Sequence, residues 1–225
     1  GHTVTTDNLA AVLAGIGATA NNGSGIASLS ALQTAVTASV TNFNTAMGVI
    51  SAYTGSNTAP TDSTYLAAGI TGVTSGNVAG LNSFIAPLSS AATDTAAEVQ
   101  AIVNTYQQLL AGADGNGTNN NVPLSAAQYQ LLGLSTVDTA AETSLLNDVL
   151  DGRSSAQLSS YADLTALANT VSDLMLTALG SAPAAPLTVT RLAALGLNNV
   201  SDLYLAAILE RRSEEHTSEL QSLRH

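Results

Sequence analysis

The chain contains Gly69-Ile70-Thr71-Gly72-Val73 and repeats this pattern as Gly133-Leu134-Ser135-Thr136-Val137 and Gly196-Leu197-Asn198-Asn199-Val200. Each copy is a glycine followed by Ile or Leu and then, four residues after the glycine, by valine. Val4 opens a further, incomplete copy, because the residues after it resemble those after Val73. A proline also precedes each glycine, as Pro60, Pro123 and Pro186. Anchors that recur at intervals of about 65 residues predict tandem modules.

Apolar residues inside each module recur with the spacing of one buried helix face. A first helix is predicted by three rows: Leu9, Val12, Leu13 and Ile16; Val78, Leu81, Phe84 and Ile85; and Leu145, Leu146, Val149 and Leu150. A longer helix follows, with the rows Leu29, Leu32, Val36, Val40, Phe43, Met47 and Ile50; Val99, Ile102, Val103, Tyr106, Leu109 and Leu110; and Leu158, Tyr161, Leu164, Leu167, Val171, Leu174 and Met175.

Helix start and stop signals support this pattern. The sequences Thr95-x-x-Glu98 and Thr139-x-x-Glu142 are typical of capping boxes, in which the two side chains satisfy unpaired N–H groups at a helix start. A short third helix is predicted between the N-caps Thr61, Ser125 and Thr188 and the closing glycines Gly69, Gly133 and Gly196. We therefore predict an all-α fold of tandem three-helix modules of about 65 residues that form an elongated array.

The predicted domain boundaries follow the glycine anchors. Residues 1–69 form helical repeat 1, which is N-terminally incomplete, and they are followed by repeats 2 (70–133), 3 (134–196) and the start of a truncated repeat 4 (197–211). Because three small helices bury little apolar surface, we expect the short helix to pack against the next module and to couple neighbours. Glu142 stands where other copies have Leu9, Val78 and Leu205, so we expect the first helix of repeat 3 to begin later or to pack differently.

The C-terminal residues have a different origin in our interpretation. Arg212 to Ser222 reads RSEEHTSELQS, which resembles a sequencing-library adapter translated in frame over eleven consecutive residues. We expect residues 212–225 to be a tail derived from this adapter and the rest to be a fragment of a longer protein, so the tail is set aside for fold reasoning.

Composition excludes several classes of protein. The formal net charge is −11, only 9% of residues are charged, and there is no cysteine, tryptophan or lysine. Disulfides, cysteine-based zinc sites and cysteine nucleophiles are therefore excluded, and the chain lacks the basic face that a nucleic-acid-binding protein needs. No apolar run has the length of a membrane-spanning helix, and we predict no membrane insertion. The three histidines are His2, near the N-terminus, and His216 and His225, in the tail, so we expect no histidine-based catalytic or metal site.

Two acidic patterns could form a calcium site or a catalytic carboxylate pair, and each also has a simpler structural interpretation. The loop Asp114 to Asn121 offers oxygens at alternate positions, like the start of a calcium loop, but Asn119 and Ser125 stand where such a loop needs Gly and Glu. We predict a solvated turn, with calcium as the alternative. Asp148 and Asp151 lie three residues apart and could form a carboxylate pair, but an exposed helix end is our preferred reading. We predict no catalytic, cofactor-binding or metal-binding residues.

The repeat motifs resemble the acidic, alanine-rich helical repeats of large secreted bacterial surface proteins of the adhesin and biofilm-matrix type. The motifs are the proline-bounded helix, Gly-Ile/Leu-x-x-Val and the stretch from Asp94 to Val103. This resemblance implies an extracellular or cell-surface location and a non-enzymatic structural or adhesive role. Its partners would be neighbouring repeats of the same chain and an extracellular protein or matrix ligand. A second resemblance, to three-helix albumin-binding modules, implies a helical binding module for a host or matrix protein as the alternative.

Overall fold

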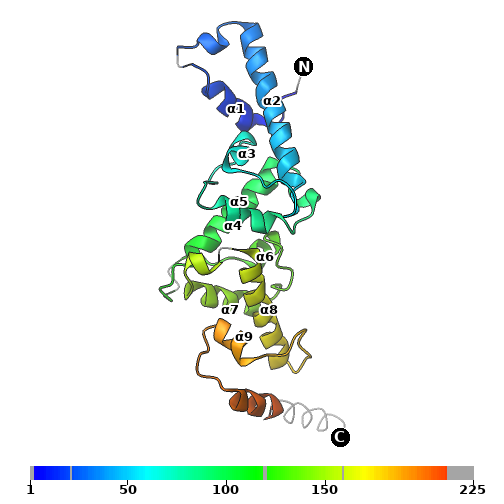
Figure 1. Cartoon of the computed structure of the whole chain (residues 1–225), viewed down its shortest axis with the longest axis vertical. Coiled ribbons are helices and arrows are strands. Elements are labelled where there is room, and N and C mark those ends of the chain that lie inside the picture. Colours follow the sequence, from blue (N-terminus) through cyan, green and yellow to red (C-terminus); the bar gives the residue numbers. More distant parts are fainter. Residues whose placement is uncertain (1–2, 21, 119–120, 159, 212–225) are drawn as a thin grey trace. The chain divides into compact units, whose positions relative to one another are not determined.

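The computed structural model describes residues 3–20, 22–118, 121–158 and 160–211, and all of the regular elements in these ranges are helical (Figure 1). The α-helices are α1 (Leu9–Gly17), α2 (Leu29–Ser51), α3 (Asp62–Ala67), α4 (Val78–Ile85), α5 (Ala96–Gly112), α6 (Ala126–Leu131), α7 (Ala140–Asp151), α8 (Tyr161–Ala178) and α9 (Val189–Ala194). Residues 202–211 are also helical. The predicted all-α class is therefore confirmed. The predicted adapter-derived tail, residues 212–225, lies outside the described residues.

The helix starts follow the predicted capping signals. Thr61, Ser125 and Thr188 are the N-caps of α3, α6 and α9, and each side chain accepts a hydrogen bond from a backbone N–H in the first turn. At α7, the Thr139 hydroxyl and the Glu142 carboxylate bond reciprocally to each other's backbone N–H groups. One prediction needs correction: Leu158 lies in the 3₁₀ turn Ser155–Leu158, and α8 begins after it, where Ser160 is the N-cap.

The three repeated glycines close the short helices in the same way. Gly69, Gly133 and Gly196 all have positive φ angles, of 72°, 87° and 96°. The N–H that follows each glycine reaches back to the carbonyl five residues earlier, as from Ile70 to Tyr65 and from Leu134 to Tyr129. This is the Schellman ending of a helix, in which a left-handed residue lets the last carbonyls find donors. Glycine adopts this conformation without a steric penalty, which explains why it recurs at these positions.

The chain divides into two compact units, residues 1–107 and 108–225, and the division falls inside α5. In the first unit, α1 packs on α2, and α2 also packs on α3. Small side chains allow this close approach, because a β-carbon on Gly15 of α1 would lie 2.0 Å from the Ser39 hydroxyl of α2. The apolar rows predicted from the sequence are buried only in part, since Val12, Val40 and Phe43 are buried whereas Leu9, Leu13 and Leu29 are exposed. The predicted module boundaries at 69/70 and 133/134 stay predictions.

The second unit is built mainly on the contact between α7 and α8. Leu146, Leu150, Leu164, Ala168 and Val171 are buried there. Toward the C-terminal end, Leu187, Leu192 and Leu205 form a separate small apolar cluster.

The first helix of predicted repeat 3 does not begin later than its counterparts. Relative to the valine anchors, α7 begins earlier, because Ala140 follows Val137 by three residues whereas Val78 follows Val73 by five. The reason is the capping box, which places Thr139 as N-cap. Glu142 is buried in this box and does not pack as the leucine that it replaces.

Candidate functional site

A buried tyrosine joins α3 to α4 in the first unit. The Tyr65 hydroxyl donates to Asn82 Oδ1 at 2.7 Å, and the Asn82 side-chain amide donates to the carbonyl of Pro60 at 2.7 Å. Both side chains are buried. The asparagine therefore connects the end of the short helix with the residue just before its N-cap, and it does so from the following helix.

The second unit contains the same arrangement between α6 and α7. The Tyr129 hydroxyl donates to Asn147 Oδ1 at 2.8 Å, and the Asn147 amide donates to the carbonyl of Leu124 at 2.8 Å. Leu124 precedes the N-cap Ser125 just as Pro60 precedes Thr61. We call each arrangement a Tyr–Asn latch. Burial raises the pKa of both tyrosine hydroxyls well above the ordinary value, so the hydroxyls stay protonated as donors.

The two latch tyrosines differ from the usual tyrosine at a helix edge, whose ring packs while its hydroxyl reaches solvent. The hydroxyls of Tyr65 and Tyr129 are both bonded inside the protein. The asparagine partners carry no local signal, since asparagine also fills the loops of this chain. A signal was present in the alignment of the repeats, because Asn82 and Asn147 each follow a buried leucine of the first helix.

A third polar cluster surrounds Arg191 at the start of α9. Its Nη2 donates to Asp173 Oδ2 at 2.6 Å, and its Nη1 donates to the carbonyls of Ala185 and Pro186. Asp173 Oδ1 accepts from the backbone N–H of Ala184 at 2.6 Å. The ion pair thereby fixes the segment between α8 and α9.

The buried carboxylates of Glu142 and Asp173 make the stability of the folded chain depend on pH. Burial favours the neutral form of Glu142 and of Asp173, but hydrogen bonds from the Thr139 hydroxyl and N–H, and from Arg191, outweigh burial and lower both pKa values. Each group therefore binds a proton less readily in the folded chain, and the stability it adds is present above the unfolded pKa, near 4, and is lost as the pH falls through the folded pKa.

We expect Glu142→Gln and Asp173→Asn to reduce the loss of unfolding free energy between about pH 5 and about pH 2. Urea unfolding across this range measures it, with Asp202→Asn as a control that removes one carboxylate from an exposed position. A pH dependence in both variants equal to that of the parent chain would contradict this assignment.

The two acidic patterns named in the sequence analysis have different surroundings in the described residues. The Asp114 carboxylate accepts from Asn116 N at 3.0 Å and from the side-chain amides of Asn116 and Asn121 at 2.7 and 2.8 Å, so its oxygens hold the turn. Asn119 and Asn120 lie outside the described residues.

The carboxylates of Asp148 and Asp151 lie in different environments, because Asp148 is exposed whereas Asp151 is buried. The prediction that Asp151 lies at an exposed helix end is therefore wrong.

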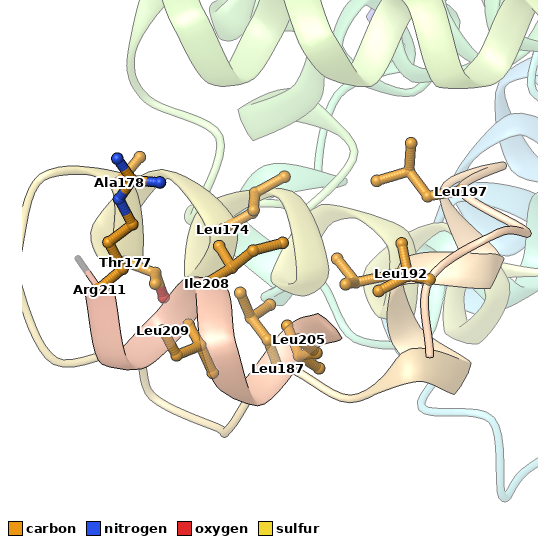
Figure 2. Close-up of a pocket in the computed structure, with 11 residues that line it drawn as sticks. Leu174, Thr177, Ala178, Leu187, Leu192, Leu197, Leu205, Ile208, Leu209 and Arg211 are labelled. Atoms are coloured by element: carbon orange, nitrogen blue, oxygen red, sulfur yellow. The ribbon is translucent and has the colours of Figure 1, made fainter. Parts of the chain in front are cut away.

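One concave surface of the described residues is an apolar groove. It lies in the second unit beside the helix of residues 202–211 and has a volume of about 550 Å³ (Figure 2). Its lining residues are Leu174, Thr177, Ala178, Leu187, Leu192, Leu197, Val200, Leu205, Ile208, Leu209 and Arg211. Leu187, Leu192 and Leu205 form its buried floor, and the side chain of Ile208 is 60% exposed. A leucine-lined surface of this kind binds apolar groups and offers little acid–base chemistry.

The part of the chain that the structure describes holds no group of three or more His, Asp or Glu side chains placed to bind a metal ion. No helix in this part is long and apolar enough to cross a membrane. Comparisons with protein-family models, with curated proteins and with solved structures found no match to this chain.

Proposed function

We propose that the chain is a non-enzymatic repeat segment with a structural or adhesive role in a large secreted or cell-surface bacterial protein. The observation that carries this proposal is the Tyr–Asn latch, which occurs twice at equivalent positions of the predicted repeats. Each latch joins the last helix of one predicted repeat to the first helix of the next. A contact that is reused at successive junctions is what couples the modules of a repeat array.

The composition and the resemblance support the rest of the proposal. Residues 3–211 contain no histidine, cysteine or lysine, which are the side chains that most often act as bases and nucleophiles. The resemblance to acidic, alanine-rich adhesin repeats supports the extracellular location and a matrix or protein ligand. The strongly acidic balance of the chain suits a soluble, self-repelling segment.

The alternative, a helical binding module, has weaker support. Such a module would present an exposed apolar surface again at equivalent repeat positions. Ile208 is 60% exposed, but its counterparts Val12, Leu81 and Leu146 are at most 3% exposed. The apolar groove is therefore not a surface that each predicted repeat displays.

The test compares residues 70–133 alone with the whole chain in urea. We expect the isolated segment to unfold at lower urea concentration and the whole chain to unfold in a steeper transition, because the slope grows with the surface that unfolds as one unit. We also expect Tyr65→Phe to destabilise by about 1–3 kcal/mol, since it leaves the buried Asn82 oxygen without its donor. Tyr129→Phe should cost less, because the half-buried Asn147 oxygen keeps the backbone N–H of Leu124 as a donor. Tyr204→Phe, at an exposed tyrosine, is the control.

Equal stability of the isolated segment and the whole chain would show independent domains. Together with neutral Tyr65→Phe and Tyr129→Phe variants, that result would overturn the coupled-array proposal and favour a binding module.

A further inference from the structure

The helix of residues 202–211 exposes a position that is buried in every other predicted copy. Ile208 follows the Val200 anchor by the same number of residues as Val12 follows Val4 and Leu81 follows Val73. In the third copy, the counterpart is Leu146, because it precedes Asn147 as Leu81 precedes Asn82, and both asparagines form a latch. The exposed fractions are 3% for Val12, 1% for Leu81 and 0% for Leu146, against 60% for Ile208.

The longer helix of the same predicted copy packs on the first helix in each buried case. Helix α1 packs on α2, and α7 packs on α8. Helix α4 meets α5 through Phe84 and Tyr106, whose ring centroids are 5.2 Å apart. The helix of residues 202–211 instead contributes Leu205 and Leu209 to the apolar cluster that also contains Leu187 and Leu192 (Figure 2). Among the described residues, this arrangement leaves Ile208 exposed beside the groove.

We infer that the apolar groove receives an amphipathic, alanine-rich helix with the pattern of α8, namely the long helix of a following repeat. This inference rests on the proposed function, since it uses the equivalence of the repeats. The pattern of α8 suits the groove, because Leu164, Leu167 and Val171 recur at the spacing of one helix face and are buried where α8 meets α7. The occupant supplies apolar side chains and closes the groove over Ile208.

The test adds a copy of α8 after the helix of residues 202–211 and keeps the spacing that separates α7 from α8. Residues 212–225 are replaced by a second copy of residues 150–180, so that Arg211 is followed by the sequence that follows Val149 in α7. We expect amide hydrogen exchange of residues 202–211 to slow by at least about tenfold relative to the parent chain, because the local opening of this helix becomes coupled to the added one.

Two exposed positions provide matched controls. Ile208→Asp leaves the parent chain unchanged, because the side chain is exposed there, and abolishes the protection in the extended chain. Leu203→Asp, at a residue that is 79% exposed and does not line the groove, preserves the protection. An extended chain whose residues 202–211 exchange as fast as in the parent would overturn the inference.

A second outcome would also overturn it. If the parent chain sediments as a dimer and Ile208→Asp makes it monomeric, the occupant is a second copy of the chain. Neither result decides the proposed function, which fails on a different measurement: uncoupled unfolding and neutral substitutions at the Tyr–Asn latches.

Discussion

Gly69→Ala is expected to destabilise the chain by about 2–5 kcal/mol, the sum of a backbone penalty and a steric one. Gly69 has a φ angle of 72°, a left-handed conformation that costs an alanine about 1–2 kcal/mol. A β-carbon at this position would also lie 2.8 Å from the backbone nitrogen of Ala11 and 3.2 Å from the β-carbon of Ala10. Because a helix backbone cannot turn aside as a flexible side chain does, α1 or the end of α3 has to move.

Gly196→Ala is the matched control for this prediction. Gly196 closes α9 in the same manner, with a φ angle of 96°, but a β-carbon there meets nothing within 4 Å. It should therefore cost only the backbone penalty of about 1–2 kcal/mol. Urea unfolding of both variants isolates the steric contribution as their difference, and equal losses would show that α1 and the end of α3 separate without cost.

Arg191→Met is expected to destabilise by about 1.5–3 kcal/mol, the range for hydrogen bonds that involve a charged group. The methionine keeps most of the aliphatic stem but removes every donor of the guanidinium. Asp173 then keeps the backbone donors on Oδ1 and loses its partner on Oδ2, while its side chain remains buried. The carbonyls of Ala185 and Pro186 lose a donor as well.

A double-mutant cycle separates the ion pair from packing. We expect Asp173→Asn in the Arg191→Met background to cost less than Asp173→Asn alone, because the carboxylate has then already lost its cation. Arg153→Met is a comparison at the other arginine near α9, whose guanidinium donates to the Ala194 carbonyl. Additive losses in the cycle would contradict a coupled pair.

The sequence was informative where the determinant of structure is local. Thr139 and Glu142, or Thr188 alone, specify a helix start through bonds to the nearest backbone groups, and the structure contains both. Gly69 specifies a helix end because few residues other than glycine adopt its φ angle. The apolar row on α2 predicted the buried residues Val40, Phe43 and Met47, because helical periodicity depends on neighbouring residues only. The row on α1 was less accurate, since Leu9 and Leu13 are exposed.

The sequence was less informative where partners are distant along the chain. Asn82 bonds to Tyr65 and Pro60, and no local pattern distinguishes it from the asparagines of the loops. Asp173 and Arg191 are eighteen residues apart and are joined by a loop whose path the spacing does not reveal. The groove depends on how the described helices pack around residues 202–211, which the sequence pattern of one helix does not specify.

The Tyr–Asn latches solve a problem that short helices have. Helices α3 and α6 have six residues each, so each offers few apolar contacts to its neighbour, and several alignments lie close in free energy. A buried asparagine with a fixed donor and a fixed acceptor tolerates only one of them, because any slip strands polar groups away from water. The chain thus obtains a unique alignment at each latch from two side chains, which leaves its remaining surface free to vary in sequence.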